Sequence, residues 1–599
     1  MKKNFNNIDL GEKDVASKYF LFYQLWIELT DEKTLDTYQF KVMNTISALE
    51  ELKKVLYQRL NRYHTTNKNI EECANETALL IKKDYVLKEQ YPIIRTRLIS
   101  HLGLNCDSDA AQRTLIHQID YCLKIIKGDY FQKLILSVEE SIENNVATEI
   151  IGKTNQLVSC CVNRGWSAKA LGKLISILND TNQHPENWEH FKDRLLNENL
   201  DEYRIFLPLR IRPISASGQK KVNALEKVKE KIQDMGISLI SGENIISEYP
   251  DLGEKVDHNQ TYVDLIETSY DIYTASHRAI STFANVLNTL SFYNLVEAWN
   301  IRDISWIAVN VLNGYNSLLK SKDLYSTYDY LEGANKIFRS SEELDKNADG
   351  TLRTKLRATY SYANIGKVSY AQEDKYINLW VALESLCRTD MYENIISNVL
   401  ETVPSALCSK YIYRCFRNFA EDCLRCGVNF DLSTKNIQLK HPDKAKVVKD
   451  VISALNNNQL YQEILAKCTV NNLLIERCKE MHKLATDEEI MFGRIDSHYL
   501  NVRRQLSRLY RIRNEIAHSA LNDTTPLLQY IEHLEDYLTT FVSEIVQCWE
   551  NHRDSDVEEI FEMIKDNYRE YSDIRAAKKK ANPKTLLDNL RTTGIIALI

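Results

Sequence analysis

The run from Arg513 to His518 combines residue types that can act on a phosphodiester. It reads Arg-Asn-Glu-Ile-Ala-His, so that Asn514 follows Arg513 directly and His518 lies five positions after Arg513. An imidazole titrates near neutral pH, and a guanidinium forms charge-assisted hydrogen bonds to phosphate oxygens. These residue types suit acid–base cleavage of a phosphodiester, with His518 as general base or acid, Arg513 stabilising the phosphorane, and Asn514 orienting His518 or a phosphate oxygen.

The asparagine makes this run more specific than an arginine and a histidine alone. Five arginine–histidine pairs in the chain have four to six residues between them. Only the pair Arg513 and His518 also has Asn directly after Arg, which is the context that a short motif needs before it carries weight. The non-functional alternative is that His518 is an ordinary histidine at the C-terminal end of a helix, where the protonated imidazole would interact favourably with the helix dipole.

The spacing of apolar residues predicts a helix that carries the run at its end. Residues of one face repeat at helical intervals: Leu506, Leu509, Ile512 and Ile516. Arg513 projects within this apolar face, where a charge is costly unless it is paired. Three further arginines are expected on the side of His518 and are candidate RNA-binding residues: Arg504, Arg508 and Arg511.

A second predicted helix offers an acid for Arg513. In the stretch Tyr-Ile-Asn-Leu-Trp-Val-Ala-Leu-Glu, which ends at Glu384, the carboxylate lies on the apolar side of the helix. A buried acid needs a cation and a buried arginine needs an acid, so we expect Glu384 and Arg513 to meet or to share one polar network. Arg513 and His518 are about 140° apart on a straight helix. Their convergence therefore requires a distorted helix end or a second subunit that supplies half of the site.

The sequence predicts a mainly α-helical protein whose helices position these residues. Residues 1–200 are predicted to form an N-terminal helical domain. Residues 201–360 are predicted to be a mixed α/β middle region, with strands at 203–211, 236–240 and 304–310, a helix at 220–235 and helices again from about 262. A loop is expected at 345–350. Residues 361–550 should form a helical catalytic domain, and 551–599 a C-terminal helix and basic tail.

Composition sets broad limits on function. The net charge is −7, so any contact with RNA must use a local basic patch. No long apolar run or signal peptide is recognisable, and the 13 scattered cysteines are typical of a reduced cytoplasm, so a cytoplasmic protein without a membrane contact is expected. The spacing of Cys408, Cys415, Cys423 and Cys426 lacks the paired knuckles of a structural zinc site, so neither a metal nor another cofactor is expected.

Two stretches of the chain resemble the Apea-like branch of the HEPN superfamily. They are Trp-Val-Ala-Leu-Glu-Ser-Leu at 380–386 and Leu-Tyr-Arg-Ile-Arg-Asn-Glu-Ile-Ala-His-Ser-Ala at 509–520, and the resemblance covers roughly residues 360–550. It implies a helical bundle that forms a homodimer, and a metal-independent endoribonuclease often used in abortive infection against phage. It also implies catalytic roles for Arg513, Asn514 and His518 and a supporting role for Glu384.

The resemblance leaves the trigger and the substrate open. Residues 1–360 are expected to sense a phage-derived trigger or to hold the enzyme inactive, and tRNA is the expected class of RNA by family analogy. The main alternative is a non-catalytic HEPN scaffold that binds RNA, a nucleotide or a protein. A third possibility is a ribonuclease that is active only within a larger assembly.

Overall fold

The computed structural model describes residues 13–31, 34, 38–61, 67–103, 108–179, 184–197, 199–211, 219–293, 295–296, 304–320, 324, 341–348, 350–369, 371–392, 394–518 and 526–578. Within these residues the protein is mainly α-helical, as predicted from the sequence, with one five-stranded and one two-stranded sheet.

Helices alone form the N-terminal part of the chain. They are α1 (Lys13–Thr30), α2 (Thr45–Leu60), α3 (Asn67–Lys83), α4 (Tyr85–Gln90), α5 (Pro92–Leu102), α6 (Asp109–Ile126), α7 (Tyr130–Glu143), α8 (Ala147–Asn163), α9 (Ala168–Leu174), the 3-10 turn η3 (Ile175–Asn179) and α10 (His184–Leu196). Helix α2 begins with a capping box, in which the Asn44 side chain accepts the amide of Ser47 and the Ser47 hydroxyl accepts the amide of Asn44. The predicted boundary near residue 200 coincides with the first strand.

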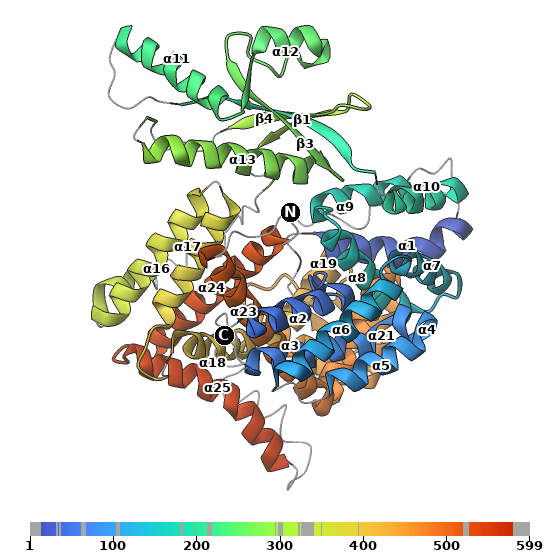
Figure 1. The fold of residues 1–599 in the computed structure, drawn as a ribbon. Coiled ribbons are helices and arrows are strands. Elements are labelled where there is room, and N and C mark those ends of the chain that lie inside the picture. Colours follow the sequence, from blue (N-terminus) through green and yellow to red (C-terminus); the bar gives the residue numbers. More distant parts are fainter. Residues whose placement is uncertain are drawn as a thin grey trace.

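An antiparallel sheet occupies the middle of the chain. Its strands are β1 (Asp201–Pro208), β2 (Ser238–Ser241), β3 (Thr261–Ser269), β4 (Ser305–Asn310) and β5 (Asn316–Lys320), in the order β2-β3-β1-β4-β5. One face packs on α11 (Gln219–Asp234) and α13 (Ile272–Phe292), and the other on α12 (Gly242–Glu248) and η4 (Pro250–Leu252). Helix α13 lies between the sheet and the helical body (Figure 1).

The C-terminal part of the chain is again helical. Its elements are α16 (Gly350–Val368), α17 (Gln372–Cys387), α18 (Ile395–Ser409), α19 (Tyr411–Arg425), β6 (Phe430–Asp431), β7 (Asn436–Ile437), α20 (Lys444–Leu455), α21 (Asn458–Lys467), η6 (Cys468–Val470), α22 (Asn472–Thr486), α23 (Glu488–His518), α24 (Leu527–Asn551) and α25 (Val557–Lys578).

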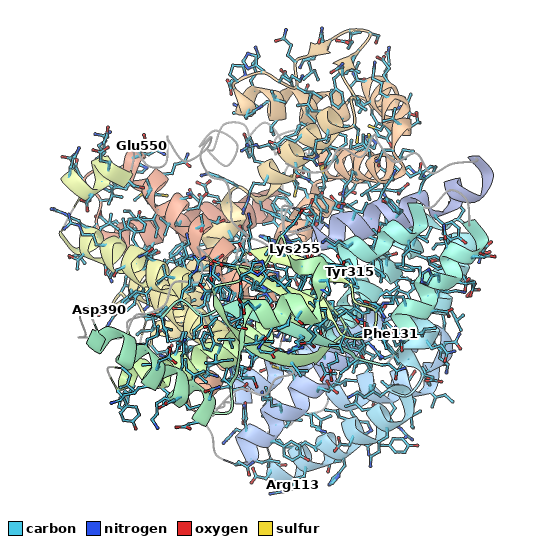
Figure 2. The ribbon with its side chains drawn as sticks, turned by 90° about the horizontal axis from the view of Figure 1, so that it is seen from above. Arg113, Phe131, Lys255, Tyr315, Asp390 and Glu550 are labelled. Atoms are coloured by element: carbon cyan, nitrogen blue, oxygen red, sulfur yellow. The ribbon has the colours of Figure 1, made fainter. Side chains whose placement is uncertain are left out.

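The apolar cores do not follow the chain in simple order. The largest cluster of buried side chains joins the N-terminal helices to α16–α18, the second half of α23, α24 and α25. A second cluster belongs to residues 408–495, most of which form α19–α22 and the start of α23. Seen from above, Lys255 and Tyr315 of the sheet unit lie over the helical body near the middle of the view, with Asp390 on one side and Phe131 on the other (Figure 2). The second half of α23, which the sequence predicts to carry the site, is therefore packed in a core that the N-terminal and the C-terminal helices share.

Two sequence-based expectations for the middle region are wrong. Residues 261–269 form β3 rather than the start of a helix, because they pair with β1 on one side and β2 on the other. Helix α13 begins only after Asp271, whose carboxylate accepts the amides of Tyr273 and Thr274 as an N-cap. Residues 341–347 are helical and α16 begins at Gly350, so 345–347 and 350 are helical rather than part of the loop expected at 345–350.

The predicted strands at 203–211, 236–240 and 304–310 are confirmed as β1, β2 and β4. Helix α25 packs Val557, Ile560 and Phe561 into the largest core and ends at Lys578, and the remainder of the expected basic tail lies outside the described residues. None of the helices in the described part of the chain is long and apolar enough to cross a membrane.

Candidate active site

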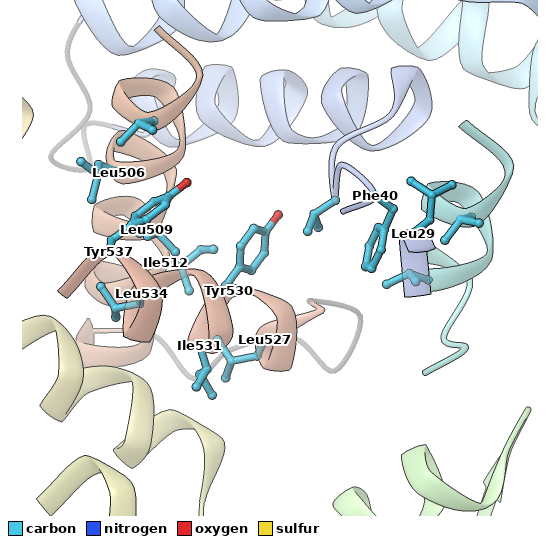
Figure 3. Close-up of a cluster of buried hydrophobic side chains, with 14 of the residues drawn as sticks. Leu29, Phe40, Leu506, Leu509, Ile512, Leu527, Tyr530, Ile531, Leu534 and Tyr537 are labelled. Atoms are coloured by element: carbon cyan, nitrogen blue, oxygen red, sulfur yellow. The ribbon is translucent and has the colours of Figure 1, made fainter. Parts of the chain in front are cut away.

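Helix α23 is held by its apolar face, as its sequence predicts. Leu506 and Leu509 are fully buried and Ile512 nearly so, against side chains of α24 such as Leu534 (Figure 3). The hydroxyl of Tyr376 on α17 donates to the carbonyl oxygen of Leu509 at 2.6 Å. In an α-helix that carbonyl also accepts the amide four residues later, that of Arg513. The turn that carries Arg513 is thereby fixed by packing and by a buried hydrogen bond.

Arg513 meets the acid that the sequence assigns to it. Its Nη2 lies 3.8 Å from Oε2 of Glu384, and its Nη1 donates to Oδ1 of Asn514 at 3.1 Å. The expected contact between α17 and α23 is therefore confirmed. It is a loose one, because 3.8 Å is beyond hydrogen-bonding distance, and the Arg513 side chain remains 28% exposed. The buried Nε of Arg513 has no hydrogen-bond partner among the described residues.

Arg508 and Arg511 are placed differently from the sequence-based expectation. Arg508 Nε donates to Glu51 Oε2 at 2.9 Å, and its Nη2 donates to Glu76 Oε2 at 2.6 Å. Arg511 Nη2 donates to Glu51 Oε1 at 2.6 Å. Both arginines thus face acids of α2 and α3, and the Arg508 side chain is only 4% exposed. The expectation that Arg508 and Arg511 are exposed for RNA is therefore wrong, because their guanidinium groups are paired with carboxylates inside the protein.

The charges in this contact reinforce each other. Burial alone would raise the pKa of Glu51, but the neighbouring Arg508 and Arg511 outweigh it and lower the pKa of Glu51 to about 2. Glu51 is therefore a carboxylate throughout the neutral range and stays paired with both arginines. Ser507 extends the contact by donating its hydroxyl to Glu72 at 3.3 Å.

The candidate catalytic run itself also contacts α2. Lys54 Nζ lies 2.6 Å from Glu515 Oε2, and Gln58 Nε2 donates to Glu515 Oε1 at 2.8 Å. Glu515 stands one residue after Asn514, so the N-terminal helices reach the turn that contains the candidate catalytic residues. Arg504 lies half-buried on α23 and has no ion pair within the described part of the chain.

Helix α23 continues without interruption to His518, its last residue. The side chain of His518 lies outside the described residues. The uninterrupted helix leaves no distorted helix end to bring residues 513 and 518 together.

Sequence reasoning missed the N-terminal partners of α23. Glu51, Lys54 and Gln58 follow one another at helical spacing of three and four residues, which makes a polar stripe beside the buried apolar face of α2. Such a stripe is usually solvent-exposed, and nothing in the sequence pairs it with residues more than 450 positions away. The hydrogen bond from Tyr376 was also not foreseen, because nothing in the sequence pairs its hydroxyl with a main-chain carbonyl of α23.

The cysteines named as possible metal ligands are buried in the second core. Among the described residues, no group of three or more Cys, His, Asp or Glu side chains is arranged to hold a metal ion. No protein-family model, curated protein or solved structure matches this chain, so its likeness to the HEPN superfamily rests on its own two motifs.

Proposed function

We propose that this protein is a metal-independent endoribonuclease whose site is formed by Arg513, Asn514 and His518. The observation that carries the proposal is the cluster at the end of α23: Arg513 and Asn514 contact each other, Glu384 lies beside them, and the helix runs on to His518. This brings a cation, an orienting amide and a titratable residue to one helix end, a combination suited to phosphodiester cleavage.

In the proposed reaction the ribose 2′-oxygen attacks the adjacent phosphorus. His518 accepts the proton of the 2′-OH as the new O–P bond forms, and Arg513 stabilises the additional negative charge on the phosphoryl oxygens. The bond from phosphorus to the 5′-oxygen breaks, and that oxygen takes up a proton. The products are a 2′,3′-cyclic phosphate and a 5′-OH, with no net uptake of water.

A homodimer is part of the proposal. Positions 513 and 518 lie about 140° apart around an uninterrupted helix, which argues for a site completed by a second copy of α23. Two copies of the motif facing each other would let the arginine of one subunit work with the histidine of the other. Cellular RNA such as tRNA is the proposed substrate, and restriction of phage by abortive infection is the proposed role.

The N-terminal helices are proposed to restrain the enzyme. Their acids occupy Arg508 and Arg511, and Lys54 and Gln58 hold Glu515. A phosphate could bind these arginines only after displacing carboxylates that already make short, buried ion pairs. A trigger that loosens α2 and α3 from α23 would release both the arginines and the catalytic turn.

The same contacts favour one alternative, a non-catalytic scaffold. A helix whose arginines are used for internal ion pairs serves stability, and a scaffold does not require its ligand to bind on α23. The scaffold proposal expects RNA or nucleotide binding without cleavage.

Induced expression followed by sequencing of 5′-OH RNA ends distinguishes the endoribonuclease from the non-catalytic scaffold. The wild-type chain is compared with His518→Ala, Arg513→Ala and the control His101→Ala, which alters a half-buried histidine at the end of α5. Because α2 and α3 are proposed to restrain the enzyme, all of these chains also carry Lys54→Ala/Gln58→Ala, which frees Glu515 from α2. In this background we expect new 5′-OH ends in the chain with an intact site and in the control, and a loss of about 100-fold or more in the two site variants. The purified protein with the intact site and the freed Glu515 should also cleave RNA in the presence of a chelator. Ends that persist in His518→Ala contradict the mechanism, and RNA binding without cleavage supports the scaffold.

A further inference from the structure

A large cleft lies between the N-terminal helices and the second core, away from the candidate active site. It encloses about 960 Å³, and its walls come from α3, α4 and α8 on one side and from α21, α22 and the start of α23 on the other. Arg513, Asn514 and Glu384 do not line it. Its volume is at the upper end of the range of about 300 to 1,000 Å³ that small-molecule sites occupy.

The walls of the cleft carry an excess of positive charge. Eight lysines and arginines line it against three acids: Lys41, Lys82, Lys83, Lys88, Arg477, Lys479, Lys483 and Arg494, with Asp84, Glu476 and Glu480. The protein as a whole has a net charge of −7, so this local excess of positive charge does not follow from its composition. Like charges that converge on a cleft repel each other, and an anionic ligand relieves that repulsion.

The three acids of the cleft are already engaged. Glu480 pairs with Arg477 at 3.1 Å and with Arg494 at 2.7 Å, and Glu476 pairs with Lys479 at 2.6 Å. Asp84 is buried and accepts the amide of Leu87 at 2.8 Å as the N-cap of α4, together with the hydroxyl of Tyr130. These acids are therefore not available to neutralise the remaining lysines.

Four lysines of the cleft have no ion pair within the described part of the chain. Lys82 and Lys83 belong to the last turn of α3, Lys88 to α4, and Lys483 to α22 on the opposite side. All four are exposed. Their ammonium groups come from two parts of the chain some 400 residues apart, so an anion held between them would bridge the N-terminal helices and the second core.

Aromatic rings complete the lining. Tyr461 and His482 stack in parallel with ring centroids 3.6 Å apart, and Tyr85 lies on the opposite wall against Gly152. The ring of His482 is fixed because its Nδ1 is 2.8 Å from the carbonyl oxygen of Leu455. Flat rings beside clustered cations suit a ligand that has both a planar group and phosphates.

We propose that this cleft binds a nucleotide with a polyphosphate chain, with the phosphates between the lysines of α3 and α22 and the base among the aromatic side chains. The proposal rests on the cleft alone and does not depend on ribonuclease activity. Asn44 and Thr45, which line the cleft, lie at the start of α2, and α2 and α3 carry the acids that hold α23. A ligand in the cleft would therefore contact the two helices that hold α23.

Isothermal titration calorimetry of the full chain with ATP and with inorganic tripolyphosphate tests the site. Both probes are used without a divalent metal at low salt, on the wild type, on Lys82→Ala/Lys483→Ala, and on the control Lys68→Ala/Lys449→Ala. The control removes exposed lysines of α3 and α20 that do not line the cleft. The lysines changed in the two double variants have no ion pair among the described residues. Both variants should therefore remain folded, and circular dichroism checks this.

We expect both probes to bind the wild type, with ATP the tighter one because only ATP has a base. The cleft double variant should weaken both by about tenfold or more, as loss of a pair of charge-assisted contacts predicts, and the control should not. Absence of binding to the wild type, or equal weakening in the two double variants, overturns the site. Equal affinity for ATP and tripolyphosphate overturns its assignment to a nucleotide.

Discussion

The two sides of helix α23 hold their arginines in opposite ways. Toward α2 and α3, Arg508 and Arg511 make hydrogen bonds of 2.6–2.9 Å to carboxylates, and their side chains are 4% and 12% exposed. Toward α17, Arg513 lies 3.8 Å from Glu384 and is 28% exposed. One helix therefore carries a closed ionic contact and an open one within six residues.

This difference separates stability from chemistry. Arg508 uses its donors on Glu51, Glu76 and the Gln505 side chain, so it has little capacity left for a ligand. Its removal would leave the buried acids without their cation. A loosely paired, partly exposed arginine contributes little to folding and keeps donors for a phosphate. The arrangement thus marks Arg508 as structural and leaves Arg513 as the candidate for function.

The substitution Arg508→Met should have the largest effect and tests whether the contact with α2 and α3 stabilises the fold. Methionine keeps much of the volume but leaves Glu76 without its cation and Glu51 with only Arg511. We expect a loss of about 3 to 5 kcal/mol in the free energy of unfolding, the usual cost of breaking a buried ion pair. Chemical denaturation followed by circular dichroism measures it. The double variant Arg508→Met/Glu76→Leu should recover part of the loss, and a single variant as stable as the wild type would remove the distinction between the two sides.

Acid should weaken the closed side selectively. The pKa of Glu51 is about 2 in the folded protein and near 4.5 in the unfolded chain, so its contribution to stability is complete above pH 4.5. It is lost as the pH falls from about 4.5 toward 2, and the difference corresponds to about 3 kcal/mol. Thermal unfolding of Glu51→Gln should therefore be less pH-dependent than that of the wild type in this window. Parallel pH profiles for the two proteins would contradict the assignment.

A smaller effect is expected where α17 fixes the turn of Arg513. Tyr376→Phe removes the hydroxyl that donates to the carbonyl oxygen of Leu509, while the ring remains in the core. The carbonyl keeps its bond within the helix, so the expected cost is about 1 kcal/mol. Denaturation of Tyr376→Phe beside Trp380→Phe, which instead changes core volume, shows whether the hydrogen bond or the packing dominates. A cost near zero would mean that packing alone holds this turn.

The smallest effect on stability is expected for Arg513→Met, the matched counterpart of Arg508→Met. A pair at 3.8 Å that is partly exposed contributes about 1 kcal/mol or less. Under the proposed function the same substitution removes RNA cleavage, so it should separate folding from activity. A loss of stability as large as that of Arg508→Met would show that Arg513 is also a structural residue.

Much of the candidate site could be read from the sequence because it depends on local pattern. Helical periodicity placed Leu506, Leu509 and Ile512 on one buried face, and the position of Arg513 within that face called for an acid. Glu384 was the acid on a second apolar helix, and the two do meet. A charge in an apolar setting is so costly that sequence alone restricts where its partner must be.

The sequence did not reveal which arginines are available. Arg504, Arg508 and Arg511 look alike in the chain, and only the fold shows that α2 and α3 bring Glu51 and Glu76 against two of them. The strand β3 was missed for a related reason, because its backbone is satisfied by pairing with β1 and β2 rather than by its own residues. What sequence determined was the mainly helical pattern, the motif and its nearest acid, since these follow from residue type and local period. Tertiary structure decided which charges are consumed by contacts across some 450 residues, because burial and pairing exist only once distant segments have packed together.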